Sequence, residues 1–332
     1  MESPTDLRDP LPEVLLLETP PPFTILGEHH FTSPKFRYLK PYEADPPPAD
    51  LDSYLVTRAR HVRAVVVSRF GKVDARLLGL LPSLGIVVTT SAGLNQVDLP
   101  ECRRRGIRIT NVGNVYSADA ADLAVGLLFD VLRRISASHR YVVQGLWGTR
   151  GDFSLGYKIG GKKVGVVGLG IIGREVAKRL EAFRCDIFYT SRKRKPDVPY
   201  PFYDNVLELA SNCDALVICC GLTDQTRYMV NKEVFSALGK DGVVINIGRG
   251  AVIDEKEMVR CLVEGEIAGA GLDVFEHEPH VPKELLQLDN VVLSPHRTGL
   301  TPETLEDLSK LVVGNLEAFF ENGPLLSEYT DD

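Results

Sequence analysis

The sequence predicts an α/β protein of two Rossmann-like domains, each built on a doubly wound parallel sheet. Three observations support this fold class. Apolar runs of strand length alternate with helical patterns, one such run ends in a glycine triplet, and the chain has 332 residues. Alternating buried strands and helices are typical of parallel sheets. This length exceeds one ordinary hydrophobic core but suits two domains of common size.

The first part of the chain is expected to form a small α/β unit of its own. Proline-rich loops there separate predicted strands at 14–18, 63–68 and 85–90 from predicted helices at 74–84 and 98–106. A long helical pattern then covers 117–144, with Ser117 as its N-cap. Its apolar face is broader than one neighbour needs, so we expect this helix to link the domains and to pack against a second copy in a homodimer.

A second α/β series begins at 162–170. Its further strand candidates are 186–191, 215–221, 242–248, 269–275 and 290–296. A final helix is predicted for 301–323, with Thr301 before it and Gly323 after it. We therefore expect a discontinuous substrate domain, residues 1–115 with 300–332, into which a cofactor domain, residues 116–299, is inserted.

The composition disfavours several classes of function. Hydrophobic residues make up 44% and charged residues 25%, as in soluble globular proteins, and the net charge of −7 disfavours nucleic-acid binding. No apolar stretch reaches membrane-spanning length and neither end resembles a targeting signal, so we expect a cytoplasmic protein. The six cysteines have neither metal-ligand spacing nor a disulfide framework, so we expect reduced thiols and no metal site.

The glycine triplet G-x-G-x-x-G lies between an apolar strand and a helix. In this context the first glycine allows a tight turn, the second lets a pyrophosphate approach the backbone, and the third lets helix and strand pack closely. The start of the helix adds N–H groups and a positive partial charge. A purely structural turn is the alternative. The predicted phosphate-binding residues are Gly168, Leu169, Gly170, Ile171, Ile172 and Gly173.

The next strand ends in Ser191, Arg192 and Lys193, at the position that lies over the adenosine ribose. An acid there would accept hydrogen bonds from both ribose hydroxyls and would repel a 2′-phosphate. A hydroxyl and two cations instead suit a phosphate dianion, which arginine can bind in a forked geometry. We therefore predict NADPH as the cofactor, with NADH used more weakly. The alternative is a solvated charge run or a nuclear-import patch.

Three later strands end in side chains that can carry out chemistry. Arg249 follows one strand, the acids Asp273, Glu276 and Glu278 follow another, and His296 follows a third. The C-terminal strand ends of an open α/β sheet surround its ligand crevice. We therefore expect a cation, a carboxylate and an imidazole to converge beside a nicotinamide. The alternatives are a structural salt bridge for the arginine and an ordinary position for the histidine.

Seven motifs follow one another along the chain, "AGLNQVDL", "RGIRITNVGN", "ADLAVGLL", "VGLGIIG", "INIGRG", "GLDVFEHEP" and "NVVLSPH". In this order they resemble the motifs of the D-isomer-specific 2-hydroxyacid dehydrogenase family, and in detail those of its plant reductases of glyoxylate, hydroxypyruvate and hydroxyphenylpyruvate. The resemblance implies reduction of a 2-oxo acid to a 2-hydroxy acid with NADPH. Glyoxylate and hydroxypyruvate are the favoured substrates, and 4-hydroxyphenylpyruvate is the alternative.

The same resemblance implies a role for each reactive group. Arg249 would hold the substrate carboxylate and polarise the ketone with its charged donor fork. His296 would donate a proton to the ketone oxygen. Glu278, which only the family pattern selects over Glu276 and Asp273, would favour the imidazolium form and orient the ring. Asp273 would bind the nicotinamide carboxamide, with a structural cap as the alternative.

Five further residues are implicated by the resemblance. Ile247 and Gly248 would present backbone to the nicotinamide ring. Ala92 and Gly93 would offer backbone N–H groups to the substrate carboxylate, with an ordinary turn as the alternative. Trp147, the only tryptophan in the chain, would reach the substrate pocket of a partner subunit or serve as an interface anchor.

The chain also departs from the family's usual pattern. Ile171 replaces an arginine, so a pyrophosphate contact from that side chain is absent. Arg297 and Thr298 follow His296 where a small or apolar residue and a glycine are usual, so we expect Thr298 to crowd the nicotinamide and Arg297 to change the charge of the pocket. A function of another class, a dinucleotide-sensing corepressor-like scaffold, is disfavoured because no long disordered tail follows the predicted fold.

Overall fold

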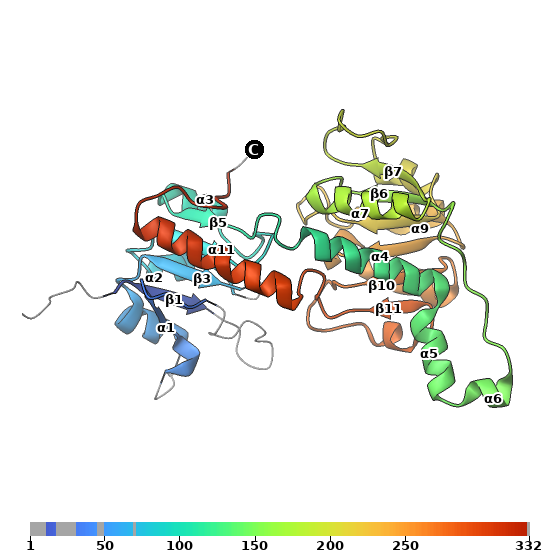
Figure 1. The fold of residues 1–332 in the computed structure, drawn as a ribbon, viewed down its shortest axis with the longest axis horizontal. Helices are drawn as coiled ribbons and strands as arrows, with labels where there is room; N and C mark the ends of the chain where they lie inside the picture. The colour runs from blue at the N-terminus through green and yellow to red at the C-terminus, as the bar shows by residue number, and fades with distance from the viewer. Residues whose placement is uncertain (1–10, 18–30, 45–49, 69–70, 331–332) are drawn as a thin grey trace, which may run out of the picture. The chain divides into compact units, whose positions relative to one another are not determined.

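The computed structural model describes residues 11–17, 31–44, 50–68 and 71–330. The chain divides into two compact units, each with its own parallel sheet (Figure 1). Unit 1 comprises Met1–Val115 and Thr301–Asp332, and unit 2 comprises Tyr116–Leu300. The predicted α/β fold with two parallel sheets is therefore confirmed.

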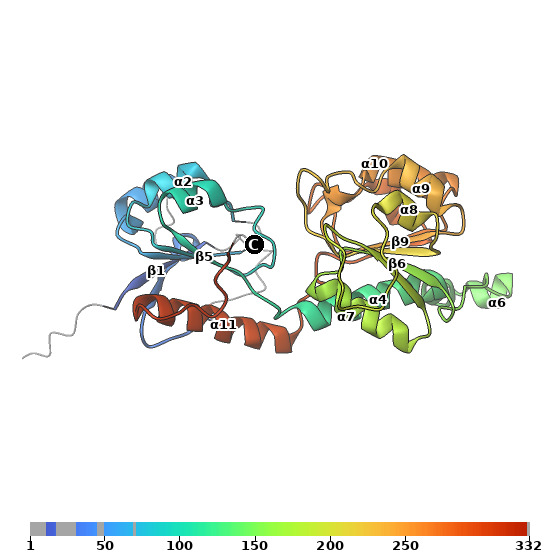
Figure 2. The ribbon, with the colours of Figure 1, turned by 90° about the horizontal axis from the view of Figure 1, so that it is seen from above.

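Unit 1 contains a five-stranded parallel sheet in the order β2-β1-β3-β4-β5. Its strands are β1 (Glu13–Leu17), β2 (Arg37–Leu39), β3 (Ala64–Val67), β4 (Ile86–Thr89) and β5 (Arg108–Thr110). Its helices are α1 (Leu51–Tyr54), η2 (Pro41–Glu43), η3 (Leu55–Ala59), α2 (Ala75–Leu80), α3 (Leu99–Arg104) and α11 (Pro302–Phe320). Helices α2 and α3 lie on one face of the sheet and α11 on the other (Figure 2).

The central strands of unit 1 are buried on both faces, which explains why they are continuous apolar runs rather than alternating ones. Every residue of β3 and β4 is buried. The predicted strands at 63–68 and 85–90 match these two, and the prediction at 14–18 matches β1, with Glu18 outside the described residues. Strands β2 and β5 were not predicted, because each has only three residues and includes an arginine.

The final helix α11 begins with a reciprocal cap, as the position of Thr301 predicts. The Thr301 hydroxyl accepts a hydrogen bond from the Thr304 backbone N–H at 3.1 Å. In return, the Thr304 hydroxyl accepts one from the Thr301 N–H at 2.8 Å. Two N–H groups that the helix itself cannot satisfy are thereby paired.

Replacing Thr301 with alanine should therefore loosen the first turns of α11 by about 1 kcal/mol. Amide hydrogen exchange in those turns should accelerate about fivefold, the factor that corresponds to this energy. Thr301→Ser is the matched control, since it keeps the capping hydroxyl and should exchange like the unchanged protein. Equal exchange in all three proteins would show that the cap contributes nothing.

Unit 2 contains a six-stranded parallel sheet in the order β11-β10-β9-β8-β6-β7. The strands are β6 (Lys163–Val167), β7 (Asp186–Thr190), β8 (Ala215–Ile218), β9 (Val243–Asn246), β10 (Gly269–Leu272) and β11 (Val291–Leu293). The chain runs from β6 to β7 on one side and then returns to place β8 on the other side. The carboxyl end of β6 is thus the switch point at which doubly wound sheets bind ligands.

Helices cover both faces of this sheet (Figure 2). Helices α4 and α7 pack together on one face, and α8, α9 and α10 cover the other. The helices of unit 2 are α4 (Ser117–Arg133), α5 (Ile135–Val143), α6 (Leu146–Arg150), α7 (Ile171–Ala182), α8 (Val206–Ala210), α9 (Lys232–Leu238), α10 (Glu255–Glu264), η4 (Gly250–Val252) and η5 (Lys283–Gln287). A separate cluster of buried apolar side chains lies on each face.

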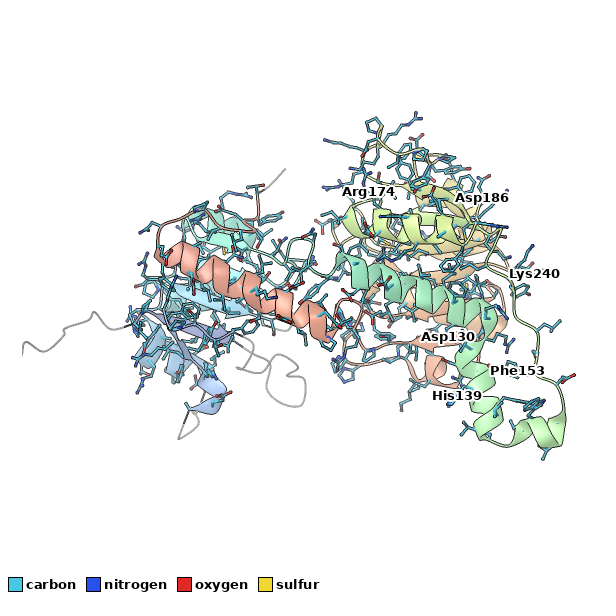
Figure 3. The ribbon with its side chains drawn as sticks, in the orientation of Figure 1. Asp130, His139, Phe153, Arg174, Asp186 and Lys240 are labelled. Atoms are coloured by element: carbon cyan, nitrogen blue, oxygen red, sulfur yellow. The ribbon has the colours of Figure 1, made fainter. Side chains whose placement is uncertain are left out.

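The single helix predicted for 117–144 is wrong in two respects. Helix α4 ends at Arg133, because Arg134 adopts a left-handed conformation with φ of 57°. The Asp130 side chain, labelled in Figure 3, then accepts the Ser136 N–H at 2.7 Å and stabilises the start of α5. Ser117 is not the N-cap but the first helical residue, and it follows Tyr116, whose side chain makes no cap.

The described residues include no helix that is both long and apolar enough to cross a membrane. Within the same residues, no group of three or more His, Cys, Asp or Glu side chains is placed to hold a metal ion.

Candidate functional site

The turn after β6 contains the three glycines of the triplet. The fold requires two of them and does not require the third. Gly168 has φ of 97°, and a β-carbon there would come within 2.8 Å of the Cys220 β-carbon. A β-carbon on Gly173 would collide with the Gly168 carbonyl oxygen, whereas one on Gly170 would meet nothing within 4 Å. The first and third glycines are therefore needed for the turn and for helix packing, while Gly170 leaves an open approach to the backbone.

This turn leads directly into α7, whose start has no side-chain cap. Gly170 is the N-cap residue, so the first N–H groups of the helix lie beside the open approach. Leu169 is fully buried and holds the turn to the core, whereas Ile171 is largely exposed. Uncapped helical N–H groups beside bare backbone fit the pyrophosphate of a dinucleotide.

The basic loop, residues 191–197, follows β7. Arg192, Lys193 and Arg194 are exposed on it. The Ser191 hydroxyl donates a hydrogen bond to the Lys193 carbonyl at 2.7 Å and so helps to close the loop. Of the three predicted phosphate ligands, Arg192 and Lys193 are thus exposed at the surface. The hydroxyl of the third, Ser191, donates its hydrogen bond within the loop. The exposed cations fit a phosphate dianion.

A buried asparagine that was not predicted shapes the turn after β9. The Asn246 side-chain oxygen accepts the Gly248 N–H at 3.0 Å, and its nitrogen donates to the Arg249 carbonyl at 3.1 Å. A β-carbon on Gly248 would collide with the Cys220 carbonyl oxygen, so only glycine fits there. In the sequence, an amide residue directly at the end of an apolar strand was the feature that could have indicated this role. Ile247, at the start of this turn, is buried.

The Arg249 side chain is half-buried, and among the described residues most of its donors have no partner. Its Nη1 donates to the Gly248 carbonyl at 2.7 Å, and this is its one side-chain hydrogen bond within the described part of the chain. Burial lowers the pKa of Arg249, and the negative charge of Glu278 opposes this by raising it. The side chain nevertheless stays protonated at neutral pH. A charged, planar donor group in this state suits a carboxylate ligand.

The predicted pair of His296 and Glu278 is present. The two side chains meet with 2.7 Å between His296 Nδ1 and Glu278 Oε2, and they are 23% and 21% exposed. The other Glu278 oxygen accepts the Phe275 N–H at 3.2 Å, which fixes the carboxylate. The Nδ1 atom faces the carboxylate, so this contact does not involve Nε2, the other ring nitrogen.

His296 also has an unusual backbone, which Asp273 supports. Its φ is 55°, in the left-handed region that few non-glycine residues adopt. The Asp273 carboxylate is fully buried and accepts the N–H groups of Arg297 at 2.7 Å and Thr298 at 3.0 Å. The Thr298 hydroxyl also donates to it. Asp273 therefore caps this turn, as the structural alternative holds, and its binding to a nicotinamide carboxamide stays a prediction.

Thr298 and Glu276 both direct their side chains to partners other than a nicotinamide or the His296 ring. Thr298 is buried and its hydroxyl faces Asp273, so the residue expected to crowd the nicotinamide is part of the turn instead. The Glu276 carboxylate accepts the Tyr228 hydroxyl. Of the three acids in this segment, Glu278 is the one whose carboxylate lies against the His296 ring.

The remaining predicted residues lie outside this group. Ala92 and Gly93 follow β4 of unit 1 in a turn closed by the Ser91 hydroxyl, which donates to the Gly93 carbonyl at 2.8 Å. Neither of their N–H groups donates a hydrogen bond among the residues that the structure describes. Trp147 is 64% exposed on α6, which lies beyond the end of α5 and away from the sheet of unit 2 (Figure 1).

Comparison with known proteins gives consistent matches. Residues 125–298 match the family model described as D-isomer specific 2-hydroxyacid dehydrogenase, NAD binding domain. The chain is 54% identical over 316 residues to the glyoxylate/hydroxypyruvate reductase HPR3 of Arabidopsis thaliana, which covers 95% of this chain and 97% of that protein. It is 51% identical over 280 residues to the hydroxyphenylpyruvate reductase of Plectranthus scutellarioides, which covers 84% and 89%.

A solved structure is similar over almost the full length. It is the NADPH-dependent glyoxylate/hydroxypyruvate reductase of Sinorhizobium meliloti in complex with NADP and malonate. The TM-score is 0.87 at 35% sequence identity, and the match covers 96% of this chain and 97% of that one.

Proposed function

The chain belongs to the D-isomer specific 2-hydroxyacid dehydrogenase family of oxidoreductases, and we propose that it reduces small 2-oxo acids to 2-hydroxy acids with NADPH. Glyoxylate and hydroxypyruvate are the proposed substrates. The observation that carries the proposal is the contact between His296 and Glu278, in the same unit as the half-buried Arg249. The substrates named for the Arabidopsis relative support the choice of acid.

The proposed reaction uses chemical groups of both the cofactor and the chain. NADPH, when bound, supplies a hydride to the carbonyl carbon. Arg249 binds the substrate carboxylate and, through its remaining donors, polarises the carbonyl oxygen. His296 gives that oxygen a proton from Nε2, and Glu278 holds the ring by Nδ1 in the orientation for transfer. Hydride and proton together convert the 2-oxo acid into the 2-hydroxy acid.

The cofactor is proposed to bind at the switch point of unit 2. Residues 168–173 would bind the pyrophosphate, Arg192 and Lys193 the 2′-phosphate, and Ile247 with Gly248 the nicotinamide ring through their backbone. The cofactor named for the Sinorhizobium structure supports NADPH over NADH. In unit 1, the N–H groups of Ala92 and Gly93 are proposed as donors to a carboxylate.

A second candidate substrate is 4-hydroxyphenylpyruvate, which the similarity to the Plectranthus reductase favours. The distinguishing experiment is a kinetic survey of the purified chain with all three 2-oxo acids and both nicotinamide cofactors. We expect NADPH oxidation with glyoxylate and hydroxypyruvate at higher kcat/KM than with hydroxyphenylpyruvate. The reverse order would select the second candidate. No oxidation with any acid would favour the dinucleotide-sensing scaffold.

A homodimer in the cytosol is also proposed. Exposed apolar side chains on α5, on α6 and in the segment after them support a partner surface there. These are Ile135, Val142, Val143, Trp147, Leu155 and Tyr157. All six cysteines are free thiols, which supports a reducing compartment.

Alanine at Gly170 should weaken cofactor binding without unfolding the protein. The added methyl group meets no protein atom within 4 Å but occupies the approach proposed for the pyrophosphate, so the Kd for NADPH should rise about tenfold or more. Stability should fall by no more than about 1 kcal/mol, the cost of changing a helix N-cap. Fluorescence titration and thermal unfolding measure the two effects.

Gly173→Ala is the contrasting variant. Its β-carbon would collide with the Gly168 carbonyl oxygen, so it should lose more than about 2 kcal/mol of stability. If Gly170→Ala bound NADPH normally, the glycine turn would be only structural.

A further inference from the structure

The basic loop is held against β7 by one buried side chain. Tyr189, the residue before the last of that strand, is 1% exposed. Its hydroxyl accepts the Lys195 N–H at 2.8 Å and donates to the Lys195 carbonyl at 3.3 Å. The phenol thus pairs both backbone groups of Lys195, as a neighbouring strand would, and fixes the end of the loop that carries Arg192 and Lys193.

The other contacts of the loop are exposed. Arg174, labelled in Figure 3 on α7, makes a forked ion pair with Asp197, with distances of 2.9 and 3.0 Å between nitrogen and oxygen atoms. Ion pairs at the surface hold a loop weakly because water and salt compete with them. The Ser191 hydroxyl bond lies within the loop and does not tie it to the sheet. Tyr189 therefore makes the best-shielded contact.

The contact between Tyr189 and Lys195 matters because the loop that it holds carries several positive charges. Arg192, Lys193 and Arg194 are consecutive exposed cations, and mutual repulsion would spread them over many arrangements if the loop were free. A phosphate dianion gathers these charges in one place, and the ordering cost is smaller if the loop is already held. In the proposed binding mode the cations of the loop contact the 2′-phosphate, so we expect this ordering to favour that phosphate more than the rest of the cofactor.

We propose that Tyr189 determines the preference for a 2′-phosphorylated cofactor by holding the basic loop in its binding arrangement. It is a positioning residue, which acts through Arg192 and Lys193. The inference rests on the proposed use of NADPH and adds the residue on which that selectivity depends.

The test is Tyr189→Phe, which keeps the buried ring and removes only the hydroxyl. Calorimetric titration with adenosine 2′,5′-bisphosphate and with AMP isolates the 2′-phosphate from the rest of the cofactor. We expect affinity for the bisphosphate to fall about five- to tenfold and affinity for AMP to stay within about twofold. The KM for NADPH should rise by the same factor as the bisphosphate Kd, with kcat and the KM for NADH unchanged.

Tyr200→Phe is the matched control. The Tyr200 hydroxyl donates to Glu181 on α7 at 2.8 Å, outside the basic loop, so both ligands should bind this variant as they bind the unchanged protein. Hydrogen exchange provides a measurement independent of whether Tyr189→Phe folds. The Lys195 amide of the unchanged, ligand-free protein should exchange slowly, and rapid exchange would overturn the inference.

The outcomes separate the two proposals. If the unchanged protein binds the bisphosphate no better than AMP, the proposed use of NADPH fails and the inference fails with it. If the unchanged protein prefers the bisphosphate and Tyr189→Phe keeps the full preference, only the inference is overturned. A Tyr189→Phe variant that loses both ligands equally would show a merely structural role, which also overturns it.

Discussion

Replacing His296 with asparagine should lower kcat by about 10²–10⁴-fold while the Kd for NADPH stays within about twofold. The variant lacks the proposed proton donor, so the oxygen that receives charge from the hydride must take its proton from water. Asparagine is the better substitute than alanine because position 296 has φ of 55°. Asparagine adopts this left-handed region with little strain, whereas alanine would add a backbone cost to the chemical one.

Single-turnover kinetics and a separate cofactor titration would measure the two quantities. His280→Asn is the matched control, because His280 is exposed and the hydrogen bond of its backbone N–H to the His277 carbonyl survives the change. It should retain normal kcat. An unchanged kcat in His296→Asn would remove the histidine from the reaction, and a large loss of NADPH affinity would assign it to cofactor binding instead.

Replacing Arg249 with lysine should lower kcat/KM for glyoxylate by about 10²–10³-fold. Lysine keeps the positive charge but loses the planar fork that can contact carboxylate and carbonyl oxygens together. Burial already lowers the pKa of Arg249. The same burial would lower a lysine pKa toward the neutral range, so part of the variant population would also lose its charge. We expect KM to rise and kcat to fall, because both the bound acid and the transition state lose contacts.

Initial rates over a wide range of glyoxylate concentration would separate KM from kcat. Arg227→Lys is the control, because this exposed arginine lies over the Tyr228 ring and should leave both constants unchanged. Normal catalysis by Arg249→Lys would mean that a positive charge alone is sufficient and that the fork plays no part.

Much of the site follows from the sequence because steric rules act locally. Gly168 and Gly173 were predictable, since a strand that turns directly into a helix leaves no space for their β-carbons. The strand ends at Arg249 and His296 were predictable as well, because parallel strands bring their carboxyl ends to one edge of the sheet.

Other features depend on tertiary contacts that a single sequence does not reveal. Asp273, Glu276 and Glu278 are all acids within six positions, and the residues alone did not distinguish them. The family resemblance selected Glu278, and the folded segment shows that its carboxylate contacts the His296 ring while the Asp273 carboxylate caps the turn that follows. The break at Arg134 has no glycine or proline to indicate it and depends on the contact between Asp130 and Ser136. Asn246 acts through two backbone bonds whose partners lie just beyond the strand.

The position of Cys220 has a consequence for any attempt to redesign this enzyme. Its β-carbon bounds the space at Gly168 and its carbonyl oxygen bounds the space at Gly248, so one residue supports both the glycine turn and the turn before Arg249. A bulkier side chain at 220 would press on the Gly168 turn, and any shift of its backbone would also displace the carbonyl oxygen that lies against Gly248. If these turns bind the coenzyme and the acid as proposed, we expect substitutions at position 220 to change both affinities together, and double-mutant analysis should find them energetically coupled.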